Sequence, residues 1–304
     1  MRCLSICCLV SAFVGLDVQG QEPAERQFDS NGLVEYIPGN LPLIIGAPHG
    51  GSLKPPAIKD RTFGVTDQDA GTQEMARMLR EAMIKKTGGA PAMVIALIHR
   101  SKLDPNREIV EAAQGDPLAE QTWQNWQGFI GKAKARVNER FGVGLYIDLH
   151  GQRHPEGRVE LGYMISAEKL REGDETLEKA SLVVRASSIR ELDQRSPANF
   201  IELLRGPTSL GGMLQARGYA SVPSPDVPAP KENELYFRGG YNTDTHGSRQ
   251  GGTISALQIE CPWVGVRDTH EHRVRFVDAL TDILPMWFKT HFGAPLAPRS
   301  PSKP

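Results

Sequence analysis

Residues 41–51 read LPLIIGAPHGG, a compact apolar run that ends in a proline, a histidine and two glycines. The run from Leu41 to Ala47 is typical of a strand buried on both faces, and the residues that follow it are typical of a loop. We therefore expect His49 at the carboxyl end of a buried strand.

Two more buried strands are expected, at residues 92–98 and 143–149. A helix starting near Asp69, a candidate N-cap, and a long helix at residues 118–141 separate the three strands. This alternation predicts an α/β fold with a mixed, mostly parallel sheet and helices on both faces. Ligands of such folds bind beyond the carboxyl ends of the strands.

The hydrophobic pattern is less regular in the second half of the chain. This pattern predicts strands at residues 159–165 and 253–260, a helix at 175–192, and a closing helix at 268–292 that Pro285 should kink. No linker divides it, so we expect one catalytic domain over residues 21–294 and a disordered tail over 295–304.

The composition is that of a folded protein that does not bind nucleic acid. The 304 residues are 39% apolar, enough for a sizeable core, and the net charge is −1 with acidic and basic residues interspersed. A chain without a basic surplus has no general attraction for nucleic acid, so we expect no nucleic-acid partner.

The first twenty residues predict export. Arg2 precedes an apolar run, Cys3 to Leu16, that is too short to span a bilayer, and small residues at 18 and 20 favour cleavage before Gln21. The alternative is a buried N-terminal helix. Cleavage would leave Cys261 as the single cysteine of a secreted or periplasmic protein with no membrane span and no internal disulfide.

Polar clusters follow four of the expected strands: residues 48–50, 100–107, 148–150 and 258–260. In a parallel sheet these clusters meet at one edge. His49 and His150 are suitable zinc ligands, because two histidines, one carboxylate and a water form a common catalytic zinc site. Asp148 lies two residues before His150 and so points the same way; it could orient that imidazole or be an ordinary buried aspartate.

These motifs together resemble the N-formylglutamate amidohydrolase family, which is grouped with zinc carboxypeptidases and aspartoacylases. The matching stretches occur in family order over most of the mature chain: residues 48–51, 67–69, 99–100, 104–107, 148–150, 239–241 and 256–260. The resemblance implies a single-domain zinc-carboxypeptidase-like (phosphorylase/hydrolase-like) fold with Zn²⁺ as cofactor.

The resemblance also implies a role for each matching residue. The zinc ligands would be His49, Asp69 and His150; Ser52 stands where related carboxypeptidases have a glutamate, which leaves Asp67 and Glu74 as alternatives to Asp69. The catalytic and substrate-binding residues would be Arg100 for the oxyanion, Asn106 and Arg107 for a substrate carboxylate, Gly240 and Tyr241 for further substrate contacts, and Glu260 as the general base.

The sequence thus predicts an exported zinc-dependent amidohydrolase that acts on a small carboxylate-bearing substrate, such as an N-acyl amino acid, a γ-glutamyl compound or a wall peptide. The alternatives are a secreted binding protein that keeps the zinc pocket without turnover, and a sugar deacetylase or esterase. Among the remaining histidines, His154 and His246 could line the pocket, whereas His270, His272 and His291 are expected on a solvated helix face.

Overall fold

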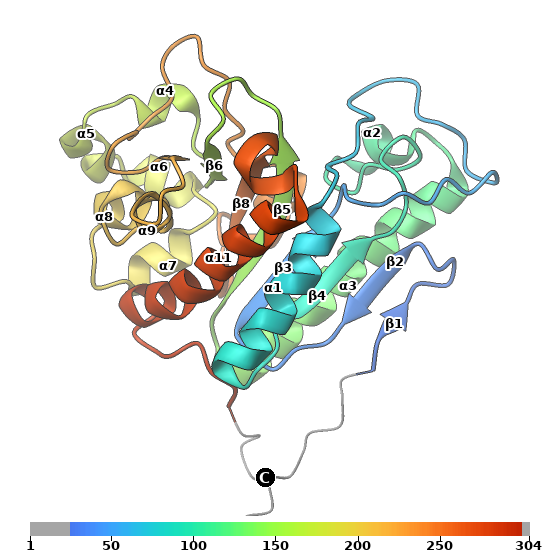
Figure 1. Cartoon of the computed structure of the whole chain (residues 1–304), viewed down its shortest axis with the longest axis horizontal. Coiled ribbons are helices and arrows are strands. Elements are labelled where there is room, and N and C mark those ends of the chain that lie inside the picture. The colour runs from blue at the N-terminus through green and yellow to red at the C-terminus, as the bar shows by residue number, and fades with distance from the viewer. Residues whose placement is uncertain (1–24, 300–304) are drawn as a thin grey trace, which may run out of the picture.

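One eight-stranded sheet organises the computed structural model, which describes residues 25–299 (Figure 1). The strands lie side by side in the order β1-β2-β4-β3-β5-β8-β6-β7. Their bounds are β1 Gln27–Phe28, β2 Val34–Ile37, β3 Leu43–Ala47, β4 Ala92–Ala96, β5 Gly144–Gln152, β6 Val159–Gly162, β7 Ser221–Val222 and β8 Ile254–Pro262.

The central strands are parallel: β3 pairs with β4 and β5, and β5 pairs with β8. Antiparallel pairing occurs toward the two sides, between β1, β2 and β4 and between β6 and β8. This is the mixed, mostly parallel sheet predicted from the sequence, and the prediction is confirmed. The carboxyl ends of β3, β4, β5 and β8 therefore share one edge of the sheet, and the β5–β8 register sets His150 opposite Glu260.

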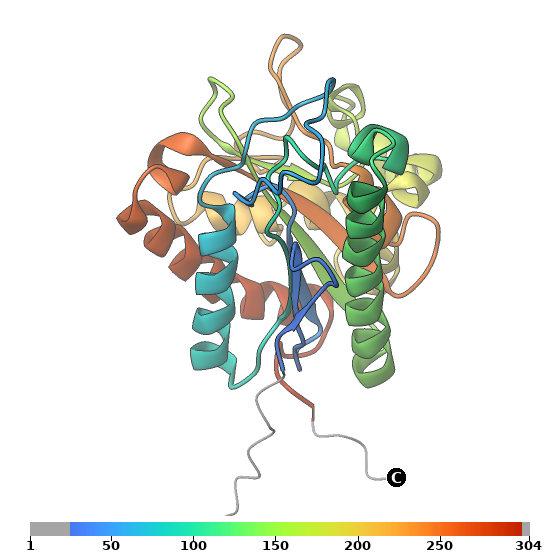
Figure 2. The same ribbon diagram turned by 90° about the vertical axis from the view of Figure 1, so that its right-hand side faces the viewer.

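Helices cover both faces of the sheet, as expected. Figure 2 shows α1 and α11 on one side of the strands and α3 on the other. The helix bounds are α1 Thr72–Thr87, α2 Ile109–Ala113, α3 Pro117–Phe141, α4 Ala167–Leu170, α5 Asp174–Lys179, α6 Ser181–Ala186, α7 Arg190–Arg195, α8 Phe200–Arg205, α9 Leu210–Gln215, α10 Tyr241–His246 and α11 His270–His291, with a short irregular turn, η1, at Trp263–Arg267.

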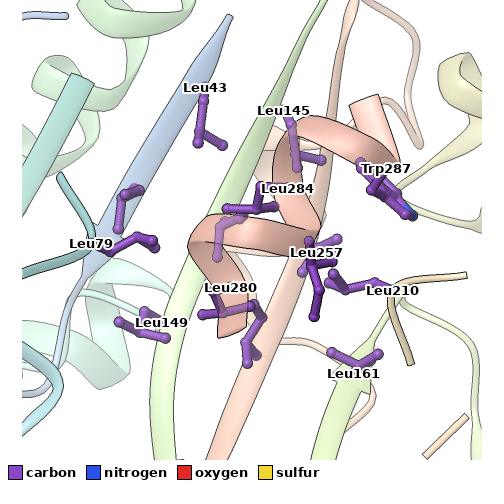
Figure 3. Packing of buried hydrophobic residues seen from close by; sticks show 14 of the residues in the cluster. Leu43, Leu79, Leu145, Leu149, Leu161, Leu210, Leu257, Leu280, Leu284 and Trp287 are labelled. Atoms are coloured by element: carbon purple, nitrogen blue, oxygen red, sulfur yellow. The ribbon is translucent and has the colours of Figure 1, made fainter. Parts of the chain in front are cut away.

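The core consists of two apolar layers, one on each side of the sheet. Leu79 of α1 and Leu280 and Leu284 of α11 pack on the strands in the larger layer (Figure 3). Trp126 and Ile130 of α3 pack on the opposite face. The apolar strand sequences are explained by this double burial, because each central strand needs apolar side chains on both faces.

One helix prediction needs correction. The helix expected at residues 175–192 is divided into α5, α6 and α7. Between α6 and α7, Ser188 bonds to β8 instead: its carbonyl accepts from Ala256 N–H at 3.0 Å and its hydroxyl donates to Ala256 O at 2.7 Å. The closing helix α11 runs through Pro285 to His291 as one element.

The described part of the chain begins and ends on the same side of the molecule, at the bottom of Figure 1. Residues 295–299 lie against the domain, since Leu296 is buried and the Arg299 guanidinium lies 5.4 Å from the centre of the Phe141 ring. The predicted signal peptide, residues 1–20, and the end of the predicted tail, 300–304, lie outside the described residues. Within residues 25–299 no helix combines the length and apolarity of a membrane span.

Candidate metal centre

Three predicted zinc ligands meet at the carboxyl edge of the sheet. His49 follows β3, His150 lies in β5, and Asp69 lies in the loop before α1. The two Nδ1 atoms are 3.1 Å apart, and Asp69 Oδ2 is 3.3 Å from each of them. All three residues are buried.

Asp69 is not the N-cap of α1, which corrects that interpretation. The helix is preceded by Gly71, which adopts a φ of 89°, and no side chain caps it. The Asp69 side chain turns toward the histidines instead, and its Oδ2 accepts a hydrogen bond from Gly151 N–H at 3.1 Å. Burial alone would raise the pKa of the Asp69 carboxyl, but hydrogen bonds from His150 and His49 hold it well below its ordinary range.

A carboxylate orients each imidazole from the other side. His49 Nε2 lies 2.7 Å from Asp104 Oδ1, and His150 Nε2 lies 2.8 Å from Asp148 Oδ2. With Nε2–H donated to a carboxylate, Nδ1 is the ring atom directed at the centre of the cluster. The orienting contact considered for Asp148 is present, whereas the sequence placed Asp104 only within a motif and assigned it no contact.

The donor set fits a tetrahedral metal ion. Nitrogen and oxygen ligands at roughly 2.0–2.1 Å from zinc are roughly 3.3 Å from one another, which matches the spacing of these three atoms. Burial would lower the pKa of His150, but the charge and hydrogen bond of Asp148, followed by the hydrogen bond of Asp69 and the charge of Glu260, raise it to about 10. Without a cation, a proton on His150 neutralises the excess carboxylate charge, and a metal would replace it.

Glu260 of β8 lies beside the cluster and is buried. Its Oε1 accepts from Gln258 Nε2 at 2.8 Å, and its Oε2 has no hydrogen-bond partner among the described residues. Burial, reinforced by the charges of Asp69 and Glu160, raises the pKa of the Glu260 carboxyl to about 8. A buried carboxyl with a free oxygen and a raised pKa is typical of a group that transfers protons.

A cavity of about 500 Å³ opens onto the cluster through Asp69 and Arg100. Arg100 donates from Nε to Asp104 Oδ2 at 2.8 Å, and its Nη1 lies 3.8 Å from Asp69 Oδ1. Its guanidinium thus lies between the ligand Asp69 and the carboxylate that orients His49. The other cavity-lining residues are Val65, Asp67, Gln68, Gly151, Gln152, Arg153, His154, Phe237 and Arg267.

The predicted substrate-binding residues do not line this cavity. Asn106 is buried, with Nδ2 3.2 Å from His150 Nε2 and Oδ1 accepting from Asn242 N–H at 2.8 Å. Gly240 packs against that amide so closely that a Cβ would lie 2.4 Å from Asn106 Nδ2. The Tyr241 ring packs on Trp123, with ring centres 5.6 Å apart.

Arg107 is held by its own segment of chain. Its Nε donates to Glu111 Oε1 at 3.2 Å and its Nη1 donates to Asn106 O at 2.8 Å. These bonds use the Nε–H donor and one Nη1–H donor of the guanidinium. The arginine therefore has the contacts of a loop-stabilising residue.

The two other candidate acidic ligands lie outside the cluster. Asp67 is exposed on the cavity wall, and Glu74 pairs with His270 Nδ1 at 2.8 Å and Arg273 Nε at 2.9 Å. Their positions leave Asp69 as the carboxylate that meets both histidines.

The remaining histidines differ from one another. His154 lines the cavity, and its Nδ1 lies 2.7 Å from the buried Glu160. His246 is buried with Nε2 2.6 Å from Gln127 Oε1, and does not line the cavity. The expectation that His291 is solvated was wrong: it is buried, with Nε2 2.8 Å from Thr208 O.

Sequence patterns gave no signal for Arg267, which joins the parts of the site. This buried guanidinium donates to three backbone carbonyls: Ala70 O at 2.7 Å, Gln152 O at 2.9 Å and Cys261 O at 3.0 Å. Each acceptor lies one or two residues after Asp69, His150 or Glu260. Arg267 therefore fixes the relative positions of the three segments that carry these residues.

Comparisons with known proteins bear on the fold. No protein-family model and no curated protein matches the chain. Among solved structures it is similar to N-formylglutamate amidohydrolase from Ralstonia eutropha JMP134, with a TM-score of 0.50 and 13% identity over 84% of this chain and 95% of that one.

Two further structures show weaker likeness. A gene product from Agrobacterium tumefaciens has a TM-score of 0.49 and 10% identity, covering 84% of this chain and 95% of that one. Succinylglutamate desuccinylase from Chromobacterium violaceum has a TM-score of 0.37 and 11% identity, covering 88% and 68%. The chain has the fold of N-formylglutamate amidohydrolase, which confirms the resemblance found in its sequence.

Proposed function

We propose that this protein is a zinc-dependent amidohydrolase that cleaves an amide bond in a small carboxylate-bearing substrate. The convergence of His49 Nδ1, His150 Nδ1 and Asp69 Oδ2 within 3.3 Å of one another carries the proposal. Two histidines and one carboxylate leave a tetrahedral ion one open position, the usual design of a catalytic rather than a structural zinc site.

Bound there, zinc would supply a water of lowered pKa and a Lewis acid for the carbonyl oxygen. Glu260 would accept the proton of that water, because it lies opposite His150 in the β5–β8 register and its Oε2 has no hydrogen-bond partner among the described residues. Arg100 would donate N–H bonds to the negative charge that develops on the carbonyl oxygen, since its guanidinium lies on the cavity wall beside Asp69.

We also propose that the protein is exported. The short positive start and the apolar run before Gln21 support this, as they are typical of a cleaved signal peptide. N-terminal sequencing of the protein secreted by a bacterial host tests it, and an intact Met1 in the recovered protein would contradict it.

A hydrolysis screen tests the proposed activity. Zinc-loaded protein is offered N-acyl amino acids, γ-glutamyl peptides and muropeptides, and released primary amine is measured. Glu260→Gln is the inactive comparison, and Glu271→Gln, at a side chain that is 74% exposed, is the matched control. Turnover of one substrate class by the wild type and the Glu271 variant, but not by the Glu260 variant, supports the proposal.

Two outcomes would contradict the proposal. Release of acetate from acetylated sugars, without cleavage of any amide that bears a carboxylate, would indicate a deacetylase or esterase. Tight binding of substrates by wild type and Glu260→Gln, with no turnover by either, would indicate a binding protein.

A further inference from the structure

Arg153 presents free hydrogen-bond donors to the cavity. It lines the cavity in the segment that leaves β5, three positions after His150. Its side chain is exposed and forms no hydrogen bond or ion pair with any residue from 25 to 299. The guanidinium carbon lies over the Trp263 ring, 4.6 Å from its centre. A guanidinium that contacts an aromatic ring through its face keeps the N–H donors in its plane available.

The backbone beneath Arg153 is held in place. Arg267 donates to the carbonyl of the preceding residue, Gln152, and its guanidinium lies 5.4 Å from the centre of the Trp263 ring. Gly151 is required next to this arginine, because a Cβ there would lie 2.2 Å from Arg267 Cζ. Arg153 and its aromatic support are therefore attached to a fixed backbone, which lowers the entropy lost when a ligand binds.

The contrast with Arg107 decides between the two arginines. Arg107 does not line the cavity, and two of its five N–H donors bond to Glu111 and to Asn106 O. Arg153 lines the cavity, and the face of its guanidinium contacts the Trp263 ring. A carboxylate needs two parallel N–H donors from one guanidinium, and Arg153 has them free.

We propose that Arg153, supported by Trp263, binds the carboxylate of the substrate. The inference rests on the proposed amidohydrolase function and moves carboxylate recognition from Arg107 to Arg153, the one of the two arginines that lines the cavity. A cavity of about 500 Å³ suits a small molecule whose amide lies at the cluster and whose carboxylate lies a few bonds away.

The kinetic test is a double-mutant cycle between an arginine and the substrate carboxylate. The best N-acyl amino acid substrate and its C-terminal carboxamide are compared with wild type, Arg153→Ala, Arg153→Lys and the matched control Arg107→Ala. We expect Arg153→Ala to lower kcat/KM for the acid by roughly 10- to 100-fold, the value of a hydrogen-bonded charge pair, and to change the amide little. Arg153→Lys should recover part of the loss, because an ammonium keeps the charge without the planar fork.

A binding measurement keeps the test independent of turnover. Calorimetric titration of N-acyl amino acids, whether or not they are hydrolysed, into zinc-loaded Glu260→Gln, with and without Arg153→Ala, should show a Kd raised roughly 10-fold or more by the arginine substitution. If the wild type hydrolyses no amide, the proposed function fails while this titration still decides the role of Arg153. Equal losses on acid and amide, an unchanged Kd, or selective loss in Arg107→Ala would overturn the inference.

Discussion

Asp148→Asn should weaken zinc binding without removing a ligand. In the wild type, Asp148 Oδ2 lies 2.8 Å from His150 Nε2, and Oδ1 accepts from the Tyr146 hydroxyl at 2.7 Å and from Asn242 Nδ2 at 3.4 Å. All three neighbours are donors, so the site suits a carboxylate with two acceptor oxygens. An amide offers one acceptor oxygen and one NH₂ donor.

Either orientation of the new amide disturbs the site. With its NH₂ toward His150, Nε2 must accept a hydrogen bond, and the ring proton moves to Nδ1, where the metal would bind. With its oxygen toward His150, the NH₂ faces the Asn242 amide, which is also a donor. Loss of one hydrogen bond to a charged group is about 1.5 to 3 kcal/mol, so zinc affinity should fall roughly 10- to 100-fold.

Competition with a chromophoric chelator measures the zinc affinity. Asp104→Asn alters the equivalent contact to His49 and should lower the zinc affinity in the same way. Asp282→Asn, at an exposed pair with Lys86, is the matched control and should keep the affinity of the wild type. Thermal unfolding gives an independent reading, because a ligand stabilises the folded state in proportion to the logarithm of its concentration over Kd. An affinity for zinc within about twofold of wild type in Asp148→Asn would refute the assigned tautomer and the role of Asp148.

Three further outcomes are expected. Glu260→Gln should bind zinc and fold like the wild type, while its turnover falls roughly 10²- to 10⁴-fold. Turnover within about threefold of wild type, measured on protein whose zinc site is fully occupied, would exclude Glu260 as the base. Because the pKa of His150 in the metal-free protein is raised to about 10, a proton competes with zinc, so zinc affinity should rise with pH below that value, and calorimetry in buffers of different ionisation enthalpy should detect proton release. Arg267→Ala should lower stability by about 2 to 4 kcal/mol, since three buried carbonyls lose their donor, and denaturant unfolding that matches wild type would contradict this.

The sequence by itself determined the central sheet and its ligand-bearing edge. Runs such as residues 41–47 and 143–149 are apolar on both faces, a pattern that parallel strands covered by helices require. Polar residues that directly follow those runs must lie at the same edge, because parallel strands end together. His49, His150 and the orienting contact of Asp148 could therefore be predicted from short stretches of chain.

Only the tertiary structure decided which partners those residues meet. The sequence pattern around Asp69 indicates a helix cap, but Gly71 takes the capping position. The Asp69 side chain instead contacts His49, which follows β3, and His150, which lies in β5. The short helices that replace residues 175–192 follow from the bonds of Ser188 to β8, a pairing between segments far apart in the chain.

The arginines show the same division. Arg107 follows the family pattern, but it bonds to Glu111 and to its own backbone neighbour and does not line the cavity. Arg153 lies on the cavity wall and has no hydrogen-bond partner among the described residues. Arg267 meets the backbone beside Asp69, His150 and Glu260 through three hydrogen bonds that no local pattern encodes. A charged side chain is specified in sequence by its type alone, whereas its role depends on which donors the folded chain leaves free.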